Sequence, residues 1–189
     1  MRTPSIARAT VATLVSLLCS CSSTPEKPVE TATTSPAPQA PKAPTGPPEF
    51  GLLTVTPDNG HGRQQVFTVR LQRTPGSPAP ALVGFLVSQF GSGSDACYVF
   101  NFPGTQRLLL VNDSGIGSQE ILAGSTGGNK QCEVVSDQPA SSVAADAVTA
   151  TFHVRFKPRF TGAKVLFAVA QDGNGVGTGL HRAGQFKLD

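Results

Sequence analysis

Apolar and polar residues alternate along residues 147–156, and this alternation restricts the segment to one kind of secondary structure. The apolar positions are Val148, Ala150, Phe152, Val154 and Phe156. A period of two sends successive side chains to opposite faces of a β-strand. We therefore expect a strand with one buried face, and we expect the face that carries Thr151, His153 and Arg155 to be exposed.

Similar short apolar stretches recur along the chain, and Gly, Pro, Asn and Asp separate them. Val, Thr and Phe are frequent in these stretches, as is typical of strands, while the separating residues are typical of turns. The further predicted strands cover residues 52–56, 65–72, 81–90, 97–102, 107–111, 131–135, 164–171 and 185–188. In residues 164–171 we expect Val165, Phe167 and Val169 to face inward. No helical pattern is present, so the sequence predicts an all-β domain of about 8–9 strands.

Strands with a single buried face must cover that face with a second sheet. We therefore expect an immunoglobulin-like antiparallel β-sandwich over residues 50–189. A closed β-barrel is the alternative.

The segment before this domain is rich in proline. Eight prolines lie between residues 25 and 48, among Ala, Thr, Ser and Lys. Such a segment has no apolar face to bury and favours extended chain at about 3.1 Å per residue. We expect residues 21–49 to be a disordered linker.

The N-terminus carries a pattern typical of export. Arg2 and Arg8 precede an apolar run at residues 11–18, which is shorter than the roughly 20 residues that a membrane span needs. The sequence Leu18-Cys19-Ser20-Cys21 then resembles the lipobox of bacterial lipoproteins. That resemblance implies that residues 1–20 are a signal peptide and that Cys21 becomes the lipidated N-terminus. An ordinary cleaved signal peptide is the alternative.

Lipidation implies a place in the cell envelope. The residue after Cys21 is Ser22, whereas Asp is the usual inner-membrane signal, so the resemblance implies the outer membrane if the cell has two membranes. The chain would contact the membrane through its N-terminal lipid.

The four cysteines then divide into two groups. Cys19 is removed with the signal peptide and Cys21 receives the lipid, which leaves Cys97 and Cys132 in the mature chain. Exported thiols meet an oxidising compartment, so we expect a structural disulfide between these two residues.

Several segments of the domain resemble a bacterial immunoglobulin-like domain of secreted and surface proteins. They are Thr-Val-Thr-Pro at 54–57, Asp-Ala-Cys-Tyr at 95–98, the Asn-Asp-Ser-Gly ending of 108–115, Asn-Lys-Gln-Cys at 129–132, and residues 155–164. The resemblance extends over nearly the whole domain. It implies an extracytoplasmic β-sandwich and implies no reaction.

Charge argues against a nucleic-acid partner. Removal of Arg2 and Arg8 would lower the formal net charge from +3 to +1. The remaining Lys and Arg residues are scattered, without a run that follows a phosphate backbone.

No motif in the sequence indicates catalysis or metal binding. The histidines His61, His153 and His181 lack the spacing of metal ligands, and no Gly-x-Ser-x-Gly elbow is present. The Gly-rich segments 124–130 and 173–177 lack the contexts of a phosphate loop or a dinucleotide-binding turn. We therefore expect no catalytic residue, no cofactor and no metal site.

Calcium binding is the main alternative for the acidic turns. Asp113, Asp172 and Asn174 carry oxygen ligands of the kind that Ca²⁺ prefers. Asp and Asn are also common turn formers, and we interpret these residues as turn residues.

Together these features predict a lipid-anchored cell-envelope module that binds or scaffolds without catalysis. We expect the loops at 115–128 and 173–184 to recognise an envelope protein or a surface ligand. A structural accessory subunit or spacer of an envelope assembly is the first alternative. A hydrolase on a β scaffold, with His153 or His181 near Asp and Ser, is the second.

Overall fold

A computed structural model describes residues 50–105, 107–136 and 140–189. The predictions made for the signal peptide, for Cys21 and for the linker at 21–49 lie outside the described residues. Within the described part of the chain, no helix is long and apolar enough to cross a membrane.

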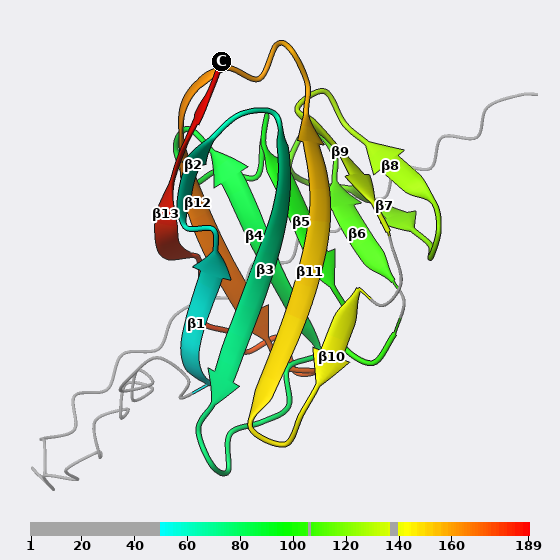
Figure 1. Ribbon diagram of the computed structural model, residues 1–189. Helices are drawn as coiled ribbons and strands as arrows, with labels where there is room; N and C mark the ends of the chain where they lie inside the picture. The colour runs from blue at the N-terminus through cyan, green and yellow to red at the C-terminus, as the bar shows by residue number, and fades with distance from the viewer. Residues whose placement is uncertain (1–49, 106, 137–139) are drawn as a thin grey trace, which may run out of the picture. The chain divides into compact units, whose positions relative to one another are not determined.

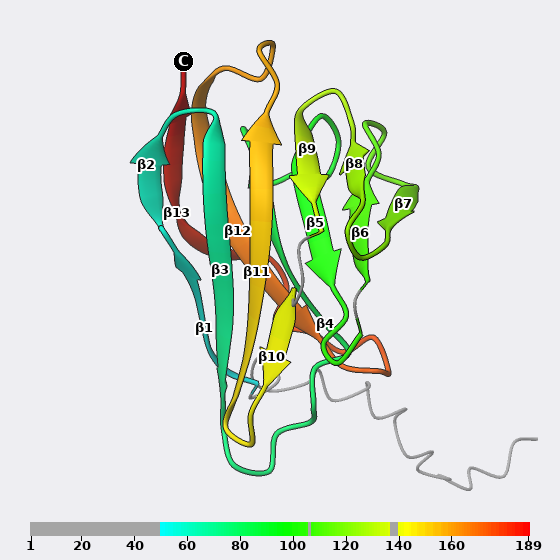
Figure 2. The same ribbon diagram turned by 45° about the vertical axis from the view of Figure 1, so that its right-hand side comes forward.

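The described residues form an all-β sandwich of two sheets (Figures 1 and 2), as the alternating pattern predicts. The first sheet has the order β1-β3-β11-β9-β8, with β10 paired to β11. Its strands are β1 (Gly51–Thr56), β3 (Gln64–Arg73), β8 (Thr126–Gly128), β9 (Cys132–Val135), β10 (Ser141–Val143) and β11 (Ala147–Phe156). All of its pairings are antiparallel.

The second sheet has the order β2-β13-β12-β4-β5-β6-β7. Its strands are β2 (Asn59–His61), β4 (Leu82–Ser88), β5 (Cys97–Asn101), β6 (Leu108–Val111), β7 (Ser118–Ile121), β12 (Gly162–Gln171) and β13 (His181–Leu188). Only β2 and β13 pair in parallel; the other pairings are antiparallel.

The strand directions give the sandwich two distinct ends. β1 begins at one end, and β4, β6 and β11 all finish at the other, where the C-terminus also lies (Figure 1). We call this second end the distal end. Five connections between the described strands lie there, at residues 62–63, 89–96, 112–117, 129–131 and 157–161.

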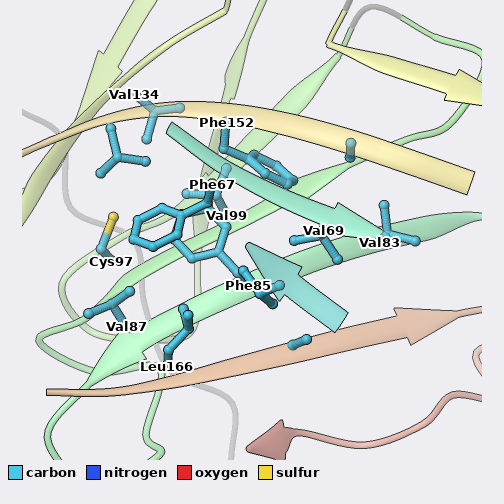
Figure 3. Packing of buried hydrophobic residues seen from close by; sticks show 14 of the residues in the cluster. Phe67, Val69, Val83, Phe85, Val87, Cys97, Val99, Val134, Phe152 and Leu166 are labelled. Atoms are coloured by element: carbon cyan, nitrogen blue, oxygen red, sulfur yellow. The ribbon is translucent and has the colours of Figure 1, made fainter. Parts of the chain in front are cut away.

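The core fills the space between the sheets (Figure 3). All five apolar positions predicted to face inward along β11 are buried, which confirms the alternation read from the sequence. Phe67 of β3 lies at the centre, with its ring centroid 5.0 Å from that of Phe85, 5.1 Å from Phe186 and 6.2 Å from Phe156. These rings come from both sheets, so the aromatic cluster joins the two layers.

The predicted disulfide between Cys97 and Cys132 is confirmed. Cys97 begins β5 in one sheet and Cys132 begins β9 in the other, with their Cα atoms 5.7 Å apart. Both residues are fully buried. The bridge therefore connects the two layers near the distal end.

The predicted inward face of β12 is wrong. Leu166, Ala168 and Ala170 are fully buried in the core cluster, whereas Val165 and Phe167 are half-buried on the outer face. Val169, the third residue predicted to face inward, is buried but does not belong to the core cluster. Both faces of this strand carry apolar residues, so a period of two does not identify the core face. A register shift against β13 between Leu166 and Phe167 adds to the ambiguity.

The predicted number of strands is also too low. Thirteen strands occur in the described residues, and the strands that the sequence did not reveal are β2, β7, β8 and β10. Each of them has only three or four residues and at most one buried position. A strand of this length lacks enough alternating positions to show a period.

Candidate functional site

Two adjoining hollows form a groove at the distal end. One has a volume of about 810 Å³ and the other about 550 Å³, and Gln131, Arg159 and Phe160 line both. We call this surface the distal groove. It is formed by side chains from residues 88–95, 128–131 and 157–164, together with Asp113.

Asn129 holds one wall of the distal groove in place. Its side-chain amide nitrogen donates to the carbonyl oxygens of Ala96 at 2.9 Å and Val111 at 3.0 Å. Its side-chain oxygen accepts from the backbone N–H groups of Gln131 and Cys132, both at 2.9 Å. One side chain thus satisfies four polar backbone groups and fixes the β8–β9 turn against β5 and β6.

The opposite wall is the β11–β12 turn, and it is fixed in a similar way. The backbone N–H of Lys157 donates to the carbonyl oxygen of Gln131 at 2.8 Å, which joins the two walls. The Arg63 guanidinium donates to the carbonyl oxygens of Lys157 at 2.8 Å and Pro158 at 3.2 Å. The walls are therefore held by the fold itself.

Gln131 has an unused acceptor in the distal groove. The residue is only 8% exposed, and its Oε1 atom has no hydrogen-bond partner among the described residues. Its Nε2 atom donates to Oδ1 of Asp95 at 3.4 Å, which fixes the orientation of the amide. Buried polar atoms normally have partners, and a buried acceptor without one costs about 1–3 kcal/mol. A donor that reached this acceptor would remove that cost.

Lys164 is a second unusual group in the distal groove. It lies at an inward position of β12 and is only 7% exposed. Its ammonium donates to the Thr161 carbonyl oxygen and lies 4.7 Å from the centroid of the Phe160 ring. Burial lowers the pKa of Lys164 from its ordinary value, because removal from water disfavours the charged form.

The other charges of the distal groove are largely positive. Lys130 lies 3.8 Å from Asp113, and Lys157 lies 3.2 Å from Glu133. Arg159 is exposed, and neither it nor Lys164 forms a salt bridge within the described residues. An anion entering the groove would therefore meet two cations that lack a carboxylate partner.

Phe90 adds an exposed aromatic side chain at the rim of the distal groove. It is 84% exposed and lines the same hollow as Lys164 and Arg159. A large exposed aromatic side chain beside a polar groove is typical of a binding surface.

The two predicted recognition loops do not form one site. Gly115 lies in the turn after β6 at the distal end, whereas the turn that begins at Asp172 follows β12 at the opposite end. Much of residues 115–128 is not loop, because it contains β7 and β8. The groove instead uses the β4–β5, β8–β9 and β11–β12 connections.

The acidic turn residues are also separated. Asp172 accepts hydrogen bonds from the backbone N–H groups of Asn174 and Val176, both at 2.9 Å, so it shapes its own turn. Asp113 lies at the distal end and accepts from the backbone N–H of Lys130 at 2.9 Å. Within the described residues, no group of three His, Cys, Asp or Glu side chains is arranged to hold a metal ion.

The histidines occupy three different strands. His61 ends β2, His153 lies in β11 and His181 begins β13. His153 lines a hollow of about 320 Å³ whose other lining residues are Gln64, Gln65, Val66, Val135, Val154 and Arg155. No Asp or Ser is among these described residues, so this hollow does not bring together the groups of a hydrolytic triad.

The comparisons with known proteins bring no relative. No family model, no curated protein and no solved structure matches this chain.

Proposed function

We propose that this chain is a lipid-anchored module of the cell envelope that binds its ligand in the distal groove without catalysis. The observation that carries the proposal is a pair of buried polar groups that line the groove and lack partners among the described residues. Oε1 of Gln131 has no hydrogen-bond partner there, and the Lys164 ammonium has no carboxylate partner.

The strand order supports an immunoglobulin-type module. The order β1-β3-β11-β9 facing β13-β12-β4-β5 corresponds to strands A, B, E and D facing G, F, C and C′ of that architecture. The disulfide differs, because it joins β5 to β9, whereas the antibody bridge joins strands B and F. Modules of this type commonly bind partners through the loops at their ends.

The geometry of the ends supports an anchored binding module over a passive spacer. β1 begins at the end opposite the distal end (Figure 2), so the chain enters the domain away from the groove and leaves the groove uncovered by β1. The exposed Phe90 at the rim also favours recognition. A spacer needs neither feature.

The first prediction tests the anchor. Replacing Cys21 with Ser is expected to abolish incorporation of labelled fatty acid and to leave uncleaved precursor, because the lipid is attached to the thiol of this residue. Stable anchoring requires more than one acyl chain, so the variant should also be absent from the membrane proteins that detergent extracts. Replacing Cys19 with Ser is the matched control and should leave labelling intact; fatty-acid labelling of Cys21→Ser would refute the anchor.

The second prediction tests binding at the distal groove. With the photoreactive residue benzoylphenylalanine at position 90, ultraviolet light is expected to crosslink the full chain to its ligand in intact envelopes. Position 143, which Val143 occupies at 59% exposure on β10, is the control and should give no such adduct. Adding Lys164→Met should abolish the adduct at position 90. Equal adducts at both positions, or none at position 90, would contradict the proposed function.

A further inference from the structure

We infer that the ligand of the distal groove is a carboxylate-bearing saccharide. Its acid group lies at Lys164 and Arg159, a hydroxyl donates to Oε1 of Gln131, and a sugar ring packs on Phe90. This inference rests on the proposed function and specifies the chemistry of the same site. All four residues line the 550 Å³ hollow.

The two cations determine the charge of the ligand. A buried ammonium without a counter-ion is costly, and an anion beside it restores the favourable interaction. Arg159 supplies a planar set of donors that matches a carboxylate in a bidentate arrangement. Both cations line the same hollow, and the inference places the acid group of the ligand there.

Gln131 determines what else the ligand carries. Its unpaired Oε1 accepts a hydrogen bond, so the ligand needs a donor beside its acid group. A bare carboxylate has no donor, because an ionised acid only accepts. Hydroxyl groups supply donors at close spacing along a sugar acid.

Phe90 and the size of the hollow fit a ring. Phe90 is 84% exposed and offers an apolar surface that the C–H face of a sugar ring can cover. The hollows of about 550 and 810 Å³ lie within the range of small-ligand sites. The second hollow continues the groove past Arg159, which leaves space for more than one sugar unit.

The backbone of the distal groove argues against an extended peptide. Peptides that add a strand need free backbone donors and acceptors on the receiving surface. Here the N–H groups of Gln131 and Cys132 donate to Asn129, and that of Lys130 donates to Asp113. The N–H of Phe160 donates to the Lys157 carbonyl oxygen at 2.9 Å. The groove therefore reads its ligand through side chains.

Two carboxylates of the groove also fit this assignment. Asp113 is held by Lys130, at the far side of the larger hollow. Asp95 lines the smaller hollow and accepts from Gln131 Nε2 through Oδ1. Its other oxygen accepts a hydrogen bond from a sugar hydroxyl, whereas a second acid group of the ligand beside Asp95 would be repelled by the carboxylate.

The experiment is calorimetric titration of the full chain in detergent with trigalacturonic acid. Maltotriose is the neutral saccharide control and triglutamate is the acidic peptide control. We expect binding of trigalacturonic acid, with maltotriose and triglutamate weaker by at least tenfold.

The variants assign the contacts. Lys164→Met should lower the affinity for trigalacturonic acid by at least tenfold, because it removes a charge-assisted interaction. Gln131→Met should lower the same affinity about three- to tenfold, because it removes the acceptor. Lys187→Met removes an exposed lysine of β13 outside the groove and should stay within about twofold of the wild type. Unchanged or raised melting temperatures of Lys164→Met and Gln131→Met would show that their losses are not failures to fold.

Each contrary outcome removes a specific part of the inference. Equal binding of maltotriose overturns the role of the acid group, and equal binding of triglutamate overturns the saccharide class. Equal losses in Lys164→Met and Lys187→Met overturn the location. If none of the three probes binds but position 90 still crosslinks in envelopes, the inference is overturned and the proposed function stands. If none binds and that adduct is also missing, both the inference and the proposed function are overturned.

Discussion

Replacing Phe67 with Ala is expected to lower the free energy of unfolding by about 3–5 kcal/mol. Phe67 is fully buried in β3, and its ring contacts Phe85 and Phe186 of the opposite sheet at centroid distances of 5.0 and 5.1 Å. The substitution removes the transfer free energy of the ring and leaves a cavity that the two rigid sheets close only in part. Phe67 packs among the buried residues between the sheets (Figure 3). Loss of its ring therefore weakens the contact between the two layers as well as the core.

The measurement is urea unfolding of the full chain followed by circular dichroism, since the chain contains no Trp. Phe90→Ala is the matched control, because it makes the same chemical change at a side chain that is 84% exposed. Its effect on unfolding should stay within about 0.5 kcal/mol. Similar destabilisation by the two substitutions would show that Phe67 is not at the centre of the core.

The fold was predictable where a strand has one buried face and enough residues to show it. β3 and β11 each have ten residues, and both strands were located from the sequence; along β11 the alternation also identified the inward positions. β12 has the same length, but Val165 and Phe167 on its outer face are as apolar as Leu166 on its inner face. The sequence therefore located this strand but not its core face. Choosing the face requires knowing on which side the other sheet packs.

The same error concealed the distal groove. With the predicted phase, Lys164 would have pointed outward as an ordinary surface lysine. In the structure, Lys164 shares the inward face with Leu166 and Ala168. A lysine at the same alternating positions as core residues is unusual, and this was the sequence signal that could have indicated the groove. Gln131 was placed in a strand beside Cys132, and no local pattern shows that its side chain lacks a partner.

The groove also depends on contacts that are distant in the sequence. Asn129 bonds to Ala96 and Val111, which lie 33 and 18 residues away, and Arg63 bonds to Lys157 at a separation of 94. Such contacts follow from the strand order and are not encoded by spacing. The loops at 115–128 and 173–184 were predicted as recognition surfaces, whereas the proposed groove is formed where connections of the two sheets converge.

Replacing both Cys97 and Cys132 with Ala is expected to lower the free energy of unfolding by about 3–4 kcal/mol. The bridge closes a loop between residues 35 positions apart, and its loss returns that chain entropy to the unfolded state. Both residues are fully buried between the sheets, so the lost sulfur contacts add to the effect. Urea unfolding of the variant and of the oxidised wild type, under identical conditions, measures the difference.

The location of the disulfide predicts where its loss is felt first. Cys132 donates its backbone N–H to Asn129, and Ala96, next to Cys97, accepts from the same side chain. The bridge thus supports the wall that presents Gln131 to the distal groove. Hydrogen exchange at the amide of Gln131, which donates to Asn129, should accelerate in the double variant more than exchange at Thr68 in the middle of β3. Equal unfolding midpoints for the two proteins would show that the bridge adds no stability, and uniform acceleration at both amides would show that it has no special role behind the groove.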